Sequence, residues 1–585
     1  MTPSLASYTR RLLWIASLGG LLYGIDVGII GSALPYLQAT SGLNADQLSI
    51  VVAAVLLGMT LSTLFAGWLA DRIGRRSLMI VAGVLFVASI PIVALAHGYA
   101  PLVAGRLLEG VSAGLVGVAV PLYLAEALPA SIRGRGTAMF QWLLTFGIVL
   151  AAAVGMYFSL RVADVAKLGD AARLLAFKDT AWRSIFWVSL PPGLVFLAGC
   201  FLLDESPRWL YLRGHRDRAA AALQLSRSPG DAAAELDAIA AVQAAEHRRR
   251  SERRDSLLQR KYVLPFLLAC VILVLNQTTG VNSIIQYNAD ILIQSGLSDL
   301  AAHWGYILFT LVNFLATIAG MMLVDRRGRK FLLTIGTAGA VVGLLWTGLM
   351  FWSNQRHEIR VTAAVQALVT PQQSLTLRFT PVLAHQLAPA ITGPASLSVI
   401  YSFGAYRSAT PVLRSDQTAV APVHITRAAS LPSNAVLAFS ANPFGSLAAA
   451  HHAPLKIDQA TLTPLPSPAW GWLTAASLFF FMASFAVGPG IVVWLALSEL
   501  MPTRIRSNGM SIALVLNEAA STLIAAAFLP AVGEYGYATL FFFFAGATVV
   551  YFLVALLWLP ETKGKTLEEI QALFHRSPRS STAAS

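Results

Sequence analysis

Long apolar runs separated by polar segments dominate the chain. Twelve of these runs are long enough to cross about 30 Å of hydrocarbon as a helix. Six lie near 12–35, 47–69, 78–96, 100–125, 138–159 and 182–203, and six more near 264–293, 303–324, 331–352, 470–497, 508–530 and 537–559. The pattern predicts an all-α integral membrane protein with twelve transmembrane helices in two six-helix halves.

Two long polar segments interrupt this pattern. Segment 204–262 is rich in Ala, Arg and Glu, which favours a linker with short helices. Segment 354–468 separates the ninth and tenth runs and contains the alternating sequences SLTLRF at 374–379 and SLSVIYSF at 396–403. Because such alternation is typical of strands, we predict a β-rich extramembrane insertion between helices 9 and 10. A largely disordered loop is the alternative.

Composition and charge set the environment and the orientation. Hydrophobic residues make up 56% of the chain and charged residues 12%, against about 25% charged in soluble proteins. The net charge of +13 could indicate a nucleic-acid partner, but the short loops near 36–47, 97–100, 294–302 and 531–536 contain no Lys or Arg. The basic residues concentrate in loops that would face the cytoplasm, as orientation requires. We therefore predict a multi-pass protein of the cell membrane with both termini cytoplasmic and no nucleic-acid partner.

This orientation assigns each part of the chain to a place in the membrane. We expect an N-terminal six-helix bundle at 1–203, a cytoplasmic linker at 204–262, helices 7–9 at 263–353, an extracytoplasmic insertion at 354–468, helices 10–12 at 469–562 and a cytoplasmic tail at 563–585. Cys200 and Cys270 both lie in apolar runs, which excludes a disulfide framework and a cysteine zinc site. No nucleophile–base pair, metal cluster or phosphate loop is visible in the sequence, so we expect neither a metal nor an enzyme.

Charged motifs repeat between the two halves, as in many transporters. The pattern D-R-x-G-R-basic occurs at Asp71–Arg76 and at Asp325–Lys330, and E-x-x-P-x-x-x-R occurs at Glu126–Arg133 and at Glu499–Arg506. Each copy falls at the cytoplasmic end of a predicted span. We predict ion pairs of a cytoplasmic gate at Asp71, Arg75, Glu126, Arg133 and Glu205 in the first half and at Asp325, Arg329, Glu499, Arg506 and Glu561 in the second.

The longer forms of these motifs resemble a known family. The sequence has GxxxDRxGRR at Gly67–Arg76, PxYxxExxPxxxRG at Pro121–Gly134, ESPRWL at Glu205–Leu210 and PETKG at Pro560–Gly564. Twelve spans with these motifs resemble the sugar porter family of the major facilitator superfamily, in particular bacterial xylose, galactose and arabinose proton symporters. The resemblance covers nearly the whole chain except 354–468. It implies a monomer in the lipid bilayer that imports a monosaccharide by proton symport through alternating access, with the proton gradient in place of any cofactor.

Ionisable residues inside predicted spans are costly and indicate function. Asp26 lies in the first span and Arg106 opens the fourth, and each buried charge needs a partner. Proton-coupled members of the resembled family have Asp at the position of Asp26, so we predict that Asp26 and Arg106 form the proton-coupling pair. A static ion pair is one alternative, and Glu109, one turn after Arg106, is another partner for the arginine.

Amide side chains in the spans suggest the sugar site, since neutral amides pair with vicinal hydroxyls. NQTTGVNSIIQY in the seventh span resembles the family's QQxxGxN, with Asn276 in place of the first Gln. The resemblance implies substrate-binding roles for Gln141, Asn276, Gln277, Asn282, Asn313, Trp494 and Asn517. A single amide in a span more often joins two helices. Glu518, next to Asn517, departs from the family pattern, and its role stays open.

These motifs determine neither which sugar is the substrate nor whether its transport is coupled to protons. Pentose, hexose and polyol porters share them, and a pocket change of one methylene discriminates by only about 1–3 kcal/mol. A facilitative sugar or polyol uniporter and a transporter-like sugar sensor are the alternative functions.

Overall fold

The computed structural model describes residues 3–563, 565 and 569, with the exception of 130–131, 252–258, 392, 418, 433–437, 439–441 and 502–505. The first half forms one bundle of long helices. Their bounds are α1 (Pro3–Ser41), α2 (Ala45–Ile73), α3 (Arg75–Ala94), α4 (Tyr99–Ala127), α5 (Arg133–Ala166), α6 (Ala171–Trp187) and α7 (Leu190–Phe201). The sixth predicted span is thus divided between α6 and α7, because α7 starts with prolines in its first turn, where the missing N–H is not needed.

The second half repeats this arrangement with more breaks. Its membrane helices are α11 (Arg260–Thr278), α12 (Val281–Gln286), α13 (Asn288–Gln294), α14 (Asp299–Arg327), α15 (Arg329–Gln355), α21 (Pro468–Val487), α22 (Pro489–Leu500) and α23 (Arg506–Leu557). In the described part of the chain, eleven helical segments are long and apolar enough to span a membrane. The last of these, α23, contains the non-helical residue Gly536 and covers two predicted spans. The twelve-helix prediction is confirmed.

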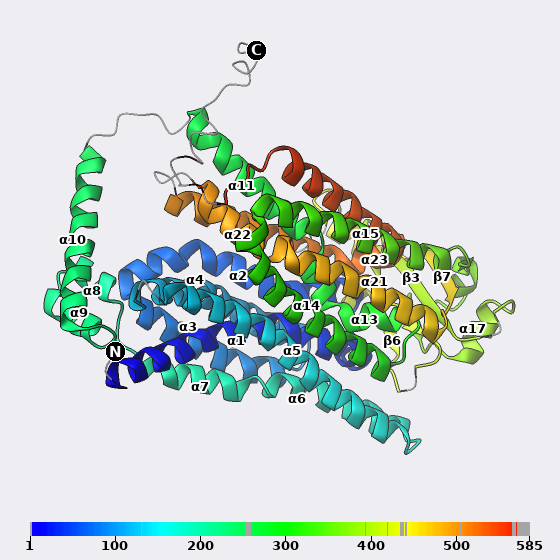
Figure 1. The fold of residues 1–585 in the computed structure, drawn as a ribbon. Coiled ribbons are helices and arrows are strands. Elements are labelled where there is room, and N and C mark those ends of the chain that lie inside the picture. Colours follow the sequence, from blue (N-terminus) through cyan, green and yellow to red (C-terminus); the bar gives the residue numbers. More distant parts are fainter. Residues whose placement is uncertain are drawn as a thin grey trace, which may run out of the picture.

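The linker between the halves forms three helices within its described residues. It contains α8 (Pro207–Leu212), α9 (Arg216–Gln224) and α10 (Pro229–Ser251). The first two are short, as expected, whereas α10 is longer. Figure 1 shows these helices at the end of the bundle where α1 begins, and we call this the motif end.

The two halves pack against each other around a shared hydrophobic core. Helix α2 of the first half lies along α23, and α5 lies along α14. Buried residues from both halves, such as Ile30 of α1, Ile284 of α12 and Phe541 of α23, belong to the same cluster. Polar side chains from the two halves can therefore contact each other only along this interface.

The polar segment between α15 and α21 folds into a separate β-rich unit, which confirms the predicted insertion. Its elements are β1 (Ile359–Arg360), α16 (Thr362–Gln366), β2 (Leu375–Leu377), α17 (Pro381–Leu387), β3 (Ala395–Phe403), β4 (Tyr406–Ala409), β5 (Leu413–Arg414), β6 (Val423–Ile425), α18 (Arg427–Ser430), α20 (Leu447–His452) and β7 (Leu455–Pro464). An antiparallel sheet has the order β1-β7-β3-β4, with β5 also paired to β3, and β2 pairs with β6. The two alternating sequences correspond to β2 and β3.

The insertion has its own hydrophobic core and sits at the end opposite α8–α10 (Figure 1), which we call the insertion end. Leu397 and Val399 of β3, with Ala460 and Leu462 of β7, belong to that core. Side chains of a strand alternate between its two faces. The intervening residues of both strands therefore face away from this core.

The insertion contacts both halves of the bundle. Toward the first half, Ala421 N donates to Ala39 O at 2.9 Å, and the Ser408 hydroxyl donates to the Asp46 carboxylate. Lys178 Nζ adds a bond of 3.1 Å to Ala419 O. Toward the second half, the buried Arg414 guanidinium donates to Leu297 O at 2.9 Å, and Arg407 pairs with Glu534 at 2.7 Å.

Candidate functional site: motif networks, amide cluster and buried charges

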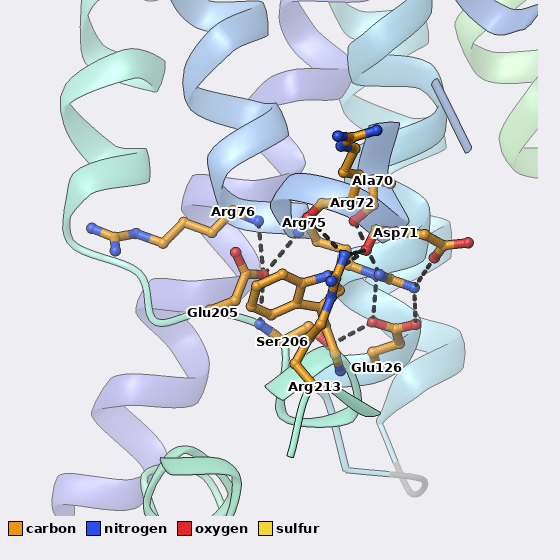
Figure 2. Close-up of polar contacts among 10 residues, drawn as sticks. Ala70, Asp71, Arg72, Arg75, Arg76, Glu126, Glu205, Ser206 and Arg213 are labelled. Atoms are coloured by element: carbon orange, nitrogen blue, oxygen red, sulfur yellow. Dashed lines mark hydrogen bonds and ion pairs between the residues drawn. The ribbon is translucent and has the colours of Figure 1, made fainter. Parts of the chain in front are cut away.

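The motifs of the first half meet around Arg75 at the start of α3 (Figure 2). Its Nε lies 2.9 Å from Glu126 Oε2 of α4, and its Nη2 lies 2.9 Å from Asp71 Oδ1 of α2. Nη1 also donates to Ala70 O at 3.1 Å. Arg75 and Glu126 are buried, whereas the Asp71 side chain is 74% exposed. One guanidinium thus holds three helices together, with the carboxylate of Glu126 as its buried partner.

Glu205 contributes to the same network by accepting hydrogen bonds from backbone N–H groups. Its Oε1 accepts from the backbone N–H groups of Arg75 at 2.8 Å and Arg76 at 3.0 Å. These are free donors of the first turn of α3, where negative charge is favourable. Gly74 precedes them with a φ of 97°, and a Cβ there would collide with the Glu205 carboxylate. The glycine of the motif therefore allows this carboxylate to approach.

The second half reproduces this geometry around Arg329. Its Nη2 lies 3.1 Å from Glu499 Oε1, and Glu561 accepts from the backbone N–H groups of Arg329 at 3.0 Å and Lys330 at 3.1 Å. Burial by itself would raise the pKa of Glu561, but bonds from backbone N–H groups outweigh it and lower the pKa. Thr562 donates to Glu499 at 2.5 Å, just as Ser206 donates to Glu126.

Three predicted gate residues cannot be placed in these networks. The side chains of Arg133, Asp325 and Arg506 lie outside the described residues. Each described network joins helices of one half only. Among described residues, side-chain hydrogen bonds between the two bundles occur only in the half of the molecule nearer the insertion end. The one farthest from that end joins Thr60 in the middle of α2 to Thr522 of α23.

The insertion end is closed by hydrogen bonds between the halves. Tyr36 of α1 donates to Asp299 of α14 at 2.8 Å, and Tyr306 of α14 donates to Gly28 O at 2.8 Å. Ser49 Oγ of α2 accepts from Leu529 N of α23 at 3.1 Å. These contacts hold the two halves together at the insertion end.

An amide cluster lies in the second half, where the seventh span is broken. Gln277 Nε2 of α11 donates to Asn517 Oδ1 of α23 at 3.2 Å. Asn282 Nδ2 of α12 donates to Gln277 Oε1 at 3.0 Å and to Ser521 Oγ at 2.9 Å. Gly280 has a φ of 77°, which ends α11 and starts α12. The break allows residues five positions apart to bond to each other through their side chains.

The cluster has additional polar groups around it. Asn517 Nδ2 donates to Glu518 Oε1 at 3.1 Å. Asn276 Oδ1 is buried and has no hydrogen-bond partner in the described part of the chain. The side-chain oxygen and nitrogen of Gln286 are also buried without a partner there. Buried polar groups normally have partners, so these amides are available to a polar ligand.

The remaining predicted binding residues are less tightly associated with the cluster. Asn313 of α14 is buried and Gln141 of α5 is half-buried. Trp494 of α22 is 44% exposed. Among described residues, Trp142 with Phe146 and Phe314 forms an aromatic cluster between the halves, at ring-centroid distances of 5.9 and 5.7 Å from Trp142.

Three ionisable side chains are buried together in the first half. Asp26, Arg106 and Glu109 are each at most 1% exposed. Arg106 Nη1 lies 2.6 Å from Glu109 Oε2, whereas neither oxygen of Asp26 has a hydrogen-bond partner among the described residues. The expected hydrogen-bonded pair of Asp26 and Arg106 is therefore not seen in this conformation. Glu109 takes the arginine because it is three residues away on the same helix.

Comparison with known proteins explains this set of features. A family model described as sugar (and other) transporter matches residues 12–370 and 451–574, most of the chain. The chain belongs to the sugar porter family of the major facilitator superfamily. The family match omits 371–450, which lies within the insertion. The sugar porter is therefore a multi-pass membrane protein with one unit added to the family fold.

Relatives with established names cover nearly the full length. The sugar porter is 28% identical to facilitated glucose transporter member 12 of Xenopus laevis, over 95% of this chain and 88% of that one. It is 27% identical to the human proton myo-inositol cotransporter, over 96% and 81%. It is 26% identical to the galactose-proton symporter of Escherichia coli, over 96% and 94%. Both proton-coupled and facilitative transporters are thus among its relatives.

Solved structures support the fold. The inward open conformation of the xylose transporter XylE from E. coli matches with a TM-score of 0.63 and 21% identity, over 96% of this chain and 98% of that one. Its partially occluded inward open conformation matches with a TM-score of 0.62 and 19% identity, over 95% and 100%.

Several residues of the sugar porter site had no clear signal in the sequence. Ser206 and Ser521 are common polar residues, and only the helical spacing of four between Asn517 and Ser521 could have indicated a shared face. Arg213 of the linker donates to the carbonyl oxygens of Asp71 and Arg72 at 2.9 Å each (Figure 2). The one indication in the sequence was that Arg213 follows the ESPRWL motif by one helical turn.

Proposed function

We propose that this sugar porter imports a neutral monosaccharide together with a proton by alternating access. The observation that carries the proposal is the amide cluster of Gln277, Asn282 and Asn517, beside a helix break and with unpartnered amides nearby. Amides donate and accept at fixed geometry, which suits vicinal hydroxyl groups. Such sites at discontinuous helices are typical of secondary transporters.

The proposed orientation places the motif end in the cytoplasm and the insertion outside the cell membrane. The concentration of Lys and Arg in the loops of the motif end supports this orientation. In the conformation described above, the site would then face the cytoplasm. The Arg75 and Arg329 networks would fix the helix ends of each bundle while the bundles rock, and their assignment to a cytoplasmic gate is part of this proposal.

We assign the carried proton to the buried site of Asp26, Arg106 and Glu109. A carboxyl group that alternates between a protonated and a charged form must change its partner between the two conformations. Asp26 makes no hydrogen bond to Arg106 here, and both Glu109 and Arg106 lie close enough to interact with it electrostatically. In the outward-facing conformation Arg106 would turn from Glu109 to Asp26. No cofactor is needed, and a monomer in the bilayer suffices.

Facilitative transport is the second candidate, and the Arg106–Glu109 pair favours it. That pair neutralises the arginine within one helix, so the charge on Asp26 could be irrelevant to the conformational change. A transport function rather than an enzyme activity is common to both candidates and agrees with the named relatives.

The test is uptake of radiolabelled D-xylose, D-galactose and myo-inositol into vesicles, with and without a proton gradient. Asp26→Asn keeps the shape of the protonated carboxyl, so we expect sugar exchange between the two sides to persist and accumulation to be lost. Asp164→Asn is the matched control, because Asp164 is 61% exposed on α5 and pairs with Lys167 at the surface. Accumulation by Asp26→Asn at the wild-type level would refute the assignment of the proton to this site. Wild-type uptake that is the same with and without the proton gradient would establish uniport.

A further inference from the structure

A polar cavity of about 200 Å³ lies where the insertion meets the second bundle. It shares no residue with the amide cluster or with the buried charges. Its walls come from β3 and β7, the end of α15, the last residue of α13 and the bend of α23 around Gly536. An inserted unit could have packed its apolar face here, yet polar side chains line the contact.

The sheet presents hydroxyl and amide groups to this cavity. Ser396 and Ser398 of β3 lie opposite Thr463 and Thr461 of β7, and Gln459 adds an amide. The side chains of Gln459, Thr461 and Thr463 make no hydrogen bond to another described residue. Their donors and acceptors are therefore free for water or for a ligand that replaces it, and such replacement is favourable only when the ligand restores the bonds.

The facing wall combines an amide with aromatic rings. The Gln355 side chain also makes no hydrogen bond within the described residues. Phe351 stacks on Tyr537 with ring centroids 4.8 Å apart, and Tyr535 is 59% exposed. Aromatic rings offer an apolar surface beside polar groups, which is the combination that the C–H and O–H faces of a sugar ring require.

The charge of the lining restricts the ligand further. No Lys or Arg belongs to the lining, so an anion would have no counter-charge. Of the two lining carboxylates, Glu534 is paired with Arg407 at 2.7 Å, and Glu358 is exposed. Among described residues there is no group of three or more His, Cys, Asp or Glu that could hold a metal ion. A neutral ligand fits this lining best.

We propose that this cavity is a second binding site, for a neutral polyhydroxylated molecule such as a monosaccharide or cyclic polyol. The class of ligand is inferred from the lining and does not depend on what the bundle transports. Gln294, at the end of α13, lines the cavity and donates to Val412 O of the insertion at 3.3 Å. Because α13 follows α12 of the amide cluster, a molecule in this cavity would contact the same broken span that forms the proposed transport site.

The experiment measures hydrogen–deuterium exchange of the full-length protein with D-xylose, D-galactose or myo-inositol. All proteins in this experiment carry Gln277→Ala, so that sugar bound at the amide cluster does not contribute to the measured protection. We expect at least one of the three to slow exchange at 459–463 and 354–358. The double variant Gln459→Ala/Thr461→Val should weaken the apparent affinity about tenfold or more, as expected for two lost hydrogen bonds.

Thr376→Val is the matched control, because Thr376 is exposed on β2 and does not line the cavity. Its ligand-dependent protection should equal that of Gln277→Ala alone. Gln355→Ala approaches the cavity from the helix side and should reproduce the loss even if the double variant misfolds. Absence of protection by all three ligands, or protection unchanged by Gln459→Ala/Thr461→Val and Gln355→Ala, would overturn the proposal. Protection without any sugar uptake would instead overturn the proposed transport function alone.

Discussion

The insertion should act on the conformational equilibrium of the transporter, and Ser408→Ala tests this. The insertion is joined by the chain to α15 and α21 and is anchored to Leu297 and Glu534, so it moves with the second half. Its bond from Ser408 to Asp46 crosses to the first half. When the insertion end opens, the halves separate there, and this bond must break. It therefore stabilises only the closed conformation.

The expected size follows from the type of bond. A hydrogen bond to a charged group contributes about 1.5–3 kcal/mol, and the lower figure applies because the site is partly accessible to water. About 1.4 kcal/mol changes an equilibrium constant tenfold. Ser408→Ala should therefore shift the population toward the conformation open at the insertion end by about tenfold. The remaining contacts, at Ala421 and Lys178, keep the closed conformation accessible.

The assay is electron spin resonance distance measurement between nitroxides at two exposed positions, Leu168 after α5 and Tyr535 in the bend of α23. The longer distance should gain population in Ser408→Ala. Ser430→Ala is the control, since Ser430 donates to Thr426 O at 2.8 Å within the insertion and this bond persists in both conformations. An unchanged distance distribution in Ser408→Ala would show that the insertion does not bias the equilibrium.

Three further changes test the site directly. Gly74→Ala places a Cβ against the Glu205 carboxylate at a φ of 97°, so it should destabilise the protein by about 1–3 kcal/mol and lower its thermal unfolding temperature. Gly67→Ala is the control, because a Cβ there would meet no neighbouring atom, and it should leave that temperature unchanged. Gln277→Ala should weaken sugar binding about tenfold or more in calorimetry, and equal affinity would remove α11 from the site. Glu561 has a pKa below its ordinary value of 4.5, so its contribution to stability is complete above that pH and is lost as pH falls through the lowered pKa. Thermal unfolding of Glu561→Gln should accordingly differ from wild type at pH 7 and converge with it in strong acid.

The helices and the motif networks could be predicted because they depend on local signals. Runs of apolar residues specify membrane helices by length alone, and the repeated motifs place one arginine and its carboxylates at equal spacing in each half. That repetition predicted ion pairs among these residues, and the structure shows Arg75 paired with Glu126 and Arg329 with Glu499. The role of Glu205 and Glu561 as acceptors for backbone N–H groups did not follow from the repetition, because backbone donors leave no trace in the spacing of charged residues.

The sequence leaves open choices between neighbouring partners. Asp26 and Glu109 are both buried acids near Arg106, and sequence spacing cannot tell which one holds the arginine in a given conformation. The binding role of Trp494, expected from its position, stays a prediction, and its side chain is 44% exposed. The cavity at the insertion could not be predicted from the sequence, because it depends on how two separately folded units meet.

The connection of the insertion to the bundle has a consequence for folding and for evolution. Strand β1 pairs with β7, with Ile359 opposite Leu462, and Asn354 at the end of α15 bonds to Pro464 O at 3.3 Å. The chain therefore leaves the membrane and returns to it at nearly the same point, and α15 packs on α21 as if a short turn joined them. Since lengthening a loop adds little entropic cost, these two helices can pair before the intervening strands have folded. A unit attached at adjacent ends can be acquired, lost or exchanged as a cassette while the helices keep their packing.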